Sequence, residues 1–162
     1  MSVTTPDVIN VTKLSPGTLR ITTGPSGSTT VEMSCHLSAG EFATDKSQDD
    51  PIPVLCGSRV ASAADYTASI SGTVLLDLAD PDSIFYYSQA HKGEQAYLEY
   101  VPNTDVGMEI SGFVTMDPLG ISGDMGANAT ADFEWSFTEY PTITPPTNGT
   151  QAASISSGTS GV

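Results

Sequence analysis

Hydrophobic and polar residues alternate along six short segments of the chain, which is the pattern of β-strands that bury one face. These segments are residues 19–23, 30–37, 65–78, 94–102, 106–116 and 127–139. In the last segment Phe133, Trp135 and Phe137 share one face, so we expect this aromatic face in the core. In residues 30–37 the same rule places Cys35 on the inward face. The pattern predicts a mainly β protein.

A single stretch, residues 80–92, has the spacing of a helix instead. Asp80 suits the N-cap, Pro81 suits the first helical position, and Gly93 supplies the stop. The mainly aromatic stripe of this helix consists of Ile84, Phe85, Tyr87 and His91. Because about three turns of helix are only marginally stable alone in water, we expect it to pack on the strands.

Three segments lack a usable period. Residues 38–58 combine acidic residues and prolines with a few apolar residues, which predicts a long loop that either docks on a partner or is simply flexible. Residues 1–17 are predicted to form an N-terminal arm and residues 141–162 a C-terminal extended arm, because both are poor in core residues. The β domain then spans residues 18–140.

Strands that bury one face and expose the other pack as two antiparallel β-sheets, in a sandwich or a partly rolled barrel. The helix would flank them at an open end or edge. A chain of 162 residues suits one such domain. Sheet edges, arms and a loop with apolar residues are all means of docking on neighbours, so the pattern favours a structural subunit.

The net charge is −14, from five basic and nineteen acidic residues. This composition excludes a protein that grips nucleic acid, because that affinity comes from Lys and Arg on phosphates. Either solubility or a surface that DNA must pass without sticking would explain the charge. The sequence shows neither a signal peptide nor an apolar run long enough to span a membrane, so we expect a protein made in a cytoplasm, without membrane contact.

Catalytic signatures are lacking in the sequence. A glycosidase needs two carboxyl groups across a cleft, whereas the carboxylates here fall on solvent-facing strand positions and turns. A nucleophile needs a base, and the only histidines, His36 and His91, belong to no local catalytic motif. We therefore predict that the protein is not an enzyme and needs no cofactor.

Metal-binding spacings are also lacking. Asp77, Asp80 and Asp82 lie close together, but the glycine turn and terminal glutamate of an EF-hand are missing, and helix capping accounts for two of them. Cys35 and Cys56 are not arranged with each other or with the histidines in a zinc-site spacing. The two cysteines could pair with each other, but without a secretion signal we expect two free thiols.

Four short motifs carry a resemblance to a known family. They are LLDLADPD at residues 75–82, PNTD at 102–105, DPLGISGD at 117–124 and DFEW at 132–135. In this order and spacing, over roughly residues 15–141, the chain resembles the major tail protein, or tail tube protein, of long-tailed, siphovirus-like bacteriophages of the actinobacteriophage-like kind.

The resemblance implies a fold of two packed β-sheets with one flanking helix, and rings of six subunits that stack into a hollow tube in the virion tail, assembled in the bacterial cytoplasm. Strands of neighbouring subunits would join into a β-barrel around the lumen, and the terminal arms would lock subunits together. The implied partners are the tape-measure protein, which fills the lumen first, and the tail terminator and distal tail proteins. Viral DNA would pass without specific binding.

The resemblance also assigns site residues. The lumen candidates are the polar residues Glu109, Ser111, Asp132, Glu134 and Ser136, with Glu32 and Ser34 as weaker candidates. The sequence does not say which sheet faces inward, so some of them could instead face the outer surface. The long loop would reach between rings, through Phe42, Asp45, Asp49, Asp50, Ile52, Val54 and Leu55.

An alternative from another class is a β-sandwich adhesin or carbohydrate-binding module on a phage or cell surface. Trp135 and the tyrosines would then form a platform for sugar rings, provided that they are exposed. The position of Trp135 between Phe133 and Phe137 on one strand face favours the core instead.

Overall fold

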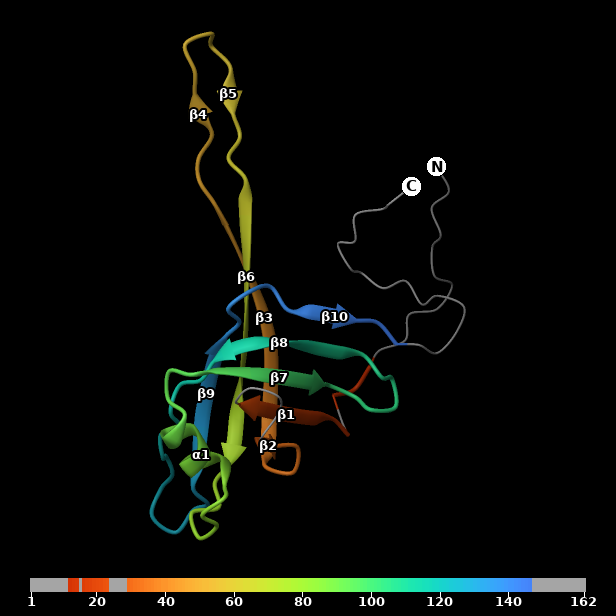
Figure 1. The fold of residues 1–162 in the computed structure, drawn as a ribbon, viewed down its shortest axis with the longest axis vertical. Coiled ribbons are helices and arrows are strands. Elements are labelled where there is room, and N and C mark those ends of the chain that lie inside the picture. The colour runs from red at the N-terminus through yellow and green to blue at the C-terminus, as the bar shows by residue number, and fades with distance from the viewer. Residues whose placement is uncertain (1–11, 15, 24–28, 147–162) are drawn as a thin grey trace.

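Two antiparallel β-sheets form the body of the protein, in a computed structural model that describes residues 12–14, 16–23 and 29–146 (Figure 1). The elements are β1 (Thr18–Thr23), β2 (Thr29–Glu32), β3 (Leu37–Gln48), β4 (Ile52–Pro53), β5 (Arg59–Val60), β6 (Ala64–Leu75), α1 (Ile84–Ala90), β7 (Gln95–Val101), β8 (Glu109–Thr115), β9 (Thr130–Ser136) and β10 (Thr142–Thr144).

The larger sheet has five strands in the order β10-β8-β7-β1-β2, and the smaller has three in the order β3-β6-β9. All neighbouring strands are antiparallel, and a bridge between Val114 and Phe137 ties β8 to the segment after β9. The fold class predicted from the alternation, mainly β with two sheets and one helix, is confirmed. The described chain holds no helix with the length and hydrophobicity needed to cross a bilayer.

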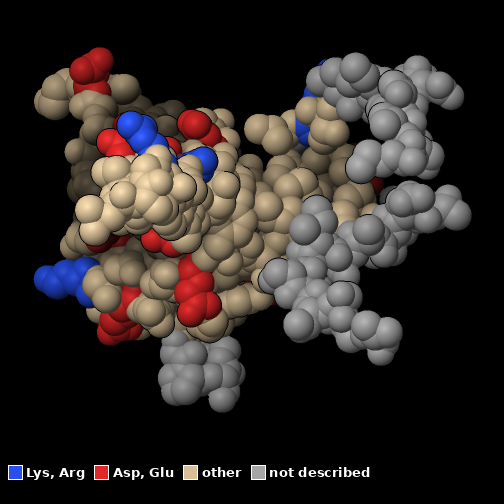
Figure 2. Space-filling model, turned by 90° about the horizontal axis from the view of Figure 1, so that it is seen from above, with Lys and Arg blue, Asp and Glu red and all other residues tan. Residues whose placement is uncertain are grey.

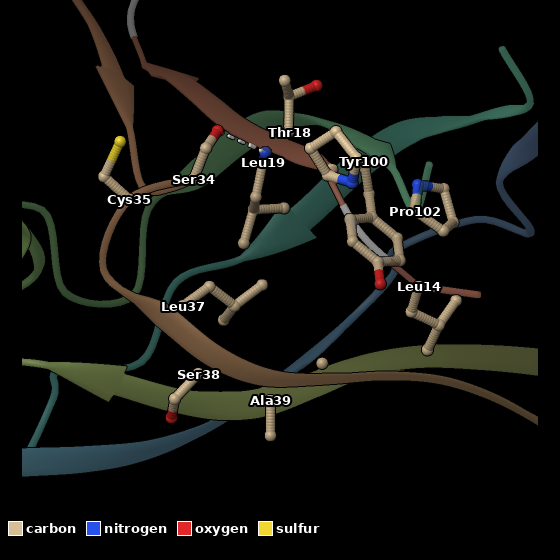
Figure 3. A pocket seen from close by; sticks show the side chains of 13 residues that line it. Leu14, Thr18, Leu19, Ser34, Cys35, Leu37, Ser38, Ala39, Tyr100 and Pro102 are labelled. Carbon is tan, nitrogen blue, oxygen red and sulfur yellow. Dashed lines mark hydrogen bonds between the residues drawn. The ribbon is translucent and has the colours of Figure 1, made fainter. Parts of the chain in front are cut away.

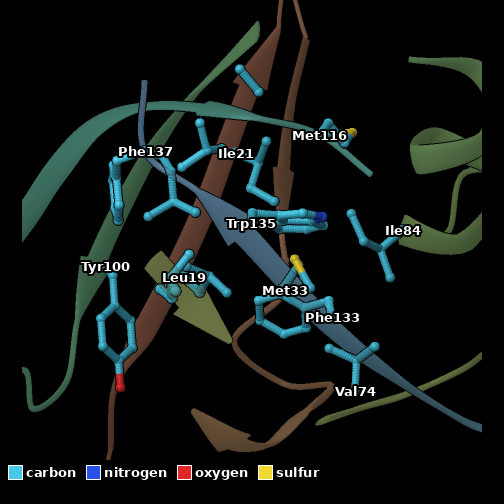
Figure 4. Close-up of a cluster of buried hydrophobic side chains, with 14 of the residues drawn as sticks. Leu19, Ile21, Met33, Val74, Ile84, Tyr100, Met116, Phe133, Trp135 and Phe137 are labelled. Carbon is cyan, nitrogen blue, oxygen red and sulfur yellow. The ribbon is translucent and has the colours of Figure 1, made fainter. Parts of the chain in front are cut away.

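The core lies between the two sheets and is centred on Trp135, which is completely buried (Figure 4). Its indole N–H donates a hydrogen bond to the carbonyl oxygen of Asp117, and the ring centroids of Trp135 and Phe133 are 4.6 Å apart. Inward-facing residues of the five-stranded sheet, including Leu19 and Ile21, belong to the same buried cluster. The period-two pattern of residues 127–139 therefore predicted the buried face of β9 correctly.

The helix is shorter than predicted and begins at Ile84, with Ser83 rather than Asp80 as its N-cap. Asp80 instead forms a turn before the helix, since its carboxylate accepts from the Asp82 N–H and its carbonyl from the Ser83 N–H. An aspartate that satisfies nearby N–H groups in a turn competes with helix formation, which explains the later start.

Ser88 joins α1 to the body and is completely buried. Its hydroxyl donates to the carbonyl of Phe85 and accepts from the N–H of Leu119, at 2.8 and 3.1 Å. The segment after β8 is thus held against the helix by one buried side chain.

Replacing Ser88 by alanine should lower the free energy of unfolding by about 1–3 kcal/mol, because the buried Leu119 N–H loses its acceptor. Urea denaturation followed by circular dichroism measures this change. The control is Ser136→Ala at an exposed position, which should change stability by less than about 0.5 kcal/mol. Equal stabilities of the two variants would contradict the assigned role of Ser88.

Residues 30–37 are not one strand. β2 ends at Glu32, a turn covers residues 34–36, and β3 starts at Leu37 in the other sheet. The Met33 carbonyl accepts from the N–H groups of His36 and Leu37, which bends the chain out of the alternation. Met33 is buried as expected, but Cys35 lies exposed in the turn, contrary to its predicted inward position.

Residues 38–58 do not form an irregular loop. β3 runs to Gln48 and pairs with β6 as far as Ala64, so the two strands make one long hairpin. β4 and β5 continue it beyond Gln48, and Gly57, with φ of 82°, lies in the turn at its end. The outer part of β3 is exposed to water on both faces. Its hydrophobic and polar residues therefore do not alternate, and the pattern did not predict a strand there.

The inner ends of both predicted arms belong to the body. Residues 142–144 form β10 at the edge of the larger sheet, paired with β8. The carbonyls of Lys13 and Pro16 accept hydrogen bonds from Asn103 and Thr104 in the β7–β8 connection. The rest of the two predicted arms, residues 1–11, 15 and 147–162, lies outside the described residues.

Candidate assembly surfaces

The outer face of the three-stranded sheet carries acidic and hydroxyl side chains. The register aligns Glu41, Ser71 and Glu134 across the three strands, and it aligns Thr73 with Asp132 in the next row. The residues that share this surface, which we call the acidic face, are Glu41, Ala43, Asp45, Thr67, Ser69, Ser71, Thr73, Asp132, Glu134 and Ser136. It holds four carboxylates and neither lysine nor arginine.

Apart from the four carboxylates, the residues of the acidic face have short side chains, namely those of alanine, serine and threonine. The Thr73 hydroxyl donates to a carboxylate oxygen of Asp132 at 2.6 Å, which holds that side chain against the sheet. The carboxylates of Glu41, Asp132 and Glu134 remain exposed to solvent. The acidic face therefore presents negative charge to solvent and has no cationic side chain that would bind phosphate.

The outer face of the five-stranded sheet has a mixed character. Arg20 lies 3.9 Å from the carboxylate of Glu32, and Tyr97 and Phe113 stack edge to face with ring centroids 5.2 Å apart. Phe113 is 53% exposed. Figure 2 shows a different side, the molecule seen from above along its long axis, and there acidic side chains are more widespread than basic ones.

The structure divides the predicted lumen residues between the two sheets. Asp132, Glu134 and Ser136 lie together on the acidic face. Glu109 and Ser111 are on β8 of the other sheet, where Ser111 is buried. Glu32 is on β2, and Ser34 lies in the following turn, where its hydroxyl accepts from the Leu19 N–H and donates to Glu32. The predicted set therefore does not form one surface. Sequence reasoning missed Glu41 and the β6 hydroxyls, because β3 was not recognised as a strand.

The hairpin of β3 and β6 extends far beyond the body (Figure 1). Pairing of β6 with β9 stops at Ser69, and from there to residue 56 the chain extends about 40 Å at the usual rise per residue. We call residues 51–60 the hairpin tip. It exposes Leu55 completely and Ile52 and Val60 by more than half.

The residues predicted for contact between rings fall into three groups. Ile52, Val54 and Leu55 are on the tip, and Asp49 and Asp50 lie just below it, all of them exposed. Asp45 lies on the acidic face. Phe42 is different, since it is partly buried and its ring packs edge to face on Phe137, against the core.

A hollow lies at the other end of the molecule, between α1 and β2. We call it the basal hollow. Three carboxylate residues, Glu32, Asp80 and Asp82, line it together with Val31, Tyr86 and other residues that include His36. Its lining contains neither lysine nor arginine.

The open side of the sandwich forms a second hollow, between β1, β7 and β3 (Figure 3). Leu14, Leu37 and Tyr100 point into it, and the Ser34 hydroxyl accepts from the Leu19 N–H at its rim. Burial raises the pKa of the Tyr100 phenol. Its lining contains no carboxylate or histidine, so it offers no acid–base pair for catalysis.

Two of the aspartates considered as metal ligands, Asp77 and Asp80, form hydrogen bonds within turns. The carboxylates of Asp77 and Asp80 accept from the N–H groups of Ala79 and Asp82, as turn residues do. Within the described ranges no three His, Cys, Asp or Glu side chains are grouped to hold a metal ion. Cys35 and Cys56 are free and exposed.

The sugar-platform alternative required both Trp135 and the tyrosines to be exposed. Since the Trp135 side chain is completely buried and its N–H is bonded within the core, it is not available to stack on a sugar ring.

Solved structures with the same fold include two from gene transfer agent (GTA) particles. A chain of the virion of a native GTA particle has 19% sequence identity and a TM-score of 0.54, and the match covers 78% of this chain and 95% of that chain. A chain in the tail of an empty GTA particle, computed with helical refinement and C6 symmetry, has 20% identity, the same TM-score and the same coverage. No protein-family model and no curated protein matches the sequence. At this identity the likeness establishes a common fold.

Proposed function

We propose that the protein is the structural subunit of a phage-type tail tube, built from stacked rings of six. The observation that carries this proposal is the shared fold with a chain of a GTA particle tail of C6 symmetry, over nearly the whole length of that chain. The order of the LLDLADPD, PNTD, DPLGISGD and DFEW motifs supports it independently.

In the proposed ring the acidic face of the three-stranded sheet lines the lumen. β3 and β9 are the outer strands of this sheet, and such edges pair readily with strands of neighbouring subunits. A surface without lysine or arginine suits this position, because each phosphate contact would add affinity and retard DNA. The mixed face of the other sheet, with Arg20 and Phe113, is then on the outside.

The hairpin is the proposed connection between rings. Its tip projects beyond the body and exposes apolar side chains that the subunit itself leaves uncovered. The terminal arms are proposed to lock subunits together, and the tape-measure, tail terminator and distal tail proteins are the proposed further partners. The subunit acts in the virion tail as a structural component, without catalysis.

Replacing residues 51–60 by the two-residue turn Asn-Gly should leave the subunit folded and abolish tubes. The body keeps its core, whereas each subunit loses its projecting apolar contact. Circular dichroism measures folding, and negative-stain electron microscopy of concentrated protein measures tube formation.

The matched control is Phe113→Ser, which also removes one exposed apolar side chain but lies on the proposed outer surface. It should form tubes as the unmodified protein does. Normal tubes from the variant with the replaced tip would refute the role of the hairpin. An unmodified protein that stays monomeric at high concentration, with no multimers in virions, would refute the proposed function.

A further inference from the structure

The hairpin tip and the basal hollow lie at opposite ends of the longest axis of the molecule (Figure 1). β4 and β5 mark one end, and α1 and β2 mark the other. Two surfaces in this arrangement meet when copies stack in the same orientation. A contact between two different surfaces of identical subunits then repeats without closing, which yields a filament.

The tip is an apolar surface that carries one cationic side chain, with the exposed Asp49 and Asp50 just below it. Residues 51–60 contain one charged residue, Arg59, and no acidic residue, in a protein whose net charge is −14. Hydrogen bonds from the Val54 N–H to the Ser58 carbonyl and from the Gly57 N–H to the Val54 carbonyl hold the turn, with Leu55 pointing fully into solvent. The tip needs a partner with apolar and acidic groups.

The basal hollow has the complementary chemistry. Asp80 and Asp82 are exposed, and neither takes part in an ion pair among the described residues. Tyr86 is 43% exposed beside them, and buried Ile84 contributes to the wall. The hollow therefore offers exposed carboxylates around an apolar surface, and its own lining contains neither lysine nor arginine.

We propose that the hairpin tip of one subunit seats in the basal hollow of a second copy in the next ring. Leu55 packs against Tyr86 and the apolar wall, and Arg59 faces the carboxylates of Asp80 and Asp82. This inference rests on the proposed function, and it names the receiving surface on the neighbouring subunit.

A charge exchange tests the pairing. Arg59→Glu and Asp82→Arg should each raise the concentration needed for tubes by about tenfold or more, because each places like charges in contact. The double variant restores opposite charges and should form tubes near the concentration of the unmodified protein. Asp82 is chosen because the Asp80 carboxylate also holds the turn before α1. The control is Asp105→Arg, which makes the same charge change on an exposed residue of the β7–β8 connection.

Cross-linking tests the contact directly. The native Cys56 is on the tip, and hydrogen bonds from Ser58 lower the pKa of its thiol, which favours the reactive thiolate. In a Cys35→Ser background, Asp82→Cys tubes treated with diamide should give a ladder of disulfide-linked chains on a non-reducing gel. Asp105→Cys tubes should stay monomeric on the same gel.

The outcomes separate the inference from the proposed function. Replacement of the tip could abolish tubes while the two charge variants assemble normally and Asp82→Cys gives no ladder. In that case the basal hollow is not the receiving surface, and the role of the hairpin stands. If neither the single charge variants nor the double variant form tubes, the pairing of Arg59 with this hollow is overturned. If the tip can be replaced without loss of tubes, the role of the hairpin and its seating in the basal hollow are both overturned, while the proposed function as a tube subunit stands.

Discussion

Replacing Trp135 by alanine should lower the free energy of unfolding by about 3–5 kcal/mol. The side chain is completely buried between the sheets, so its removal leaves a cavity against Phe133 and frees the Asp117 carbonyl from its hydrogen bond. Small domains are stable by only about 5–15 kcal/mol, so much of the variant should be unfolded or recovered poorly. Urea denaturation followed by far-ultraviolet circular dichroism measures the loss, since Trp135 is the only tryptophan and fluorescence disappears with it.

Trp135→Phe and Phe113→Ala are the matched variants. The first retains most of the aromatic volume and should lose less stability than the alanine variant. The second removes a ring that is 53% exposed and should cost far less than removal of the buried indole. A loss below about 1 kcal/mol for Trp135→Ala would contradict the central position assigned to it.

Introducing lysine on the acidic face should slow DNA passage through the proposed tube by about tenfold or more at low salt. The variant is Glu41→Lys with Glu134→Lys, two exposed positions on opposite strands of the same row. Folding and assembly should persist, because neither side chain packs in the core. Repeated in every subunit, the new ammonium groups would contact phosphates along the whole lumen.

Particles reconstituted with the variant subunit allow the test, with DNA release measured by fluorescence of an intercalating dye. Release should recover as salt is raised, because the phosphate contacts are weakened by counterions. Thr22→Lys on the outer face of the five-stranded sheet is the control, and its release should match that of the unmodified particle. Normal release from the double lysine variant at low salt would show that the acidic face does not line the path of the DNA.

The helix shows how far local patterns reach. Its apolar stripe predicted that it packs on the body, and Ile84 and Ser88 are indeed buried. Its N-cap was predicted three residues too early, at Asp80 instead of Ser83. The reason is that the segment from Asp80 to Asp82 suits either a helix N-terminus or a preceding turn. The backbone hydrogen bonds that decide between them are visible only in the structure.

From the sequence alone, the alternation of β6 and β9 determined a two-sheet β protein with an aromatic core, and the charge balance predicted a protein that does not grip nucleic acid. Only the tertiary structure decided that residues 37–48 form a strand, because β3 owes its conformation to distant hydrogen bonds with β6 and buries little of its own surface. The same pairing brings Glu41 beside Ser71 and Glu134, and carries the apolar tip away from the body. Long-range register, which no local pattern encodes, created both surfaces proposed for assembly.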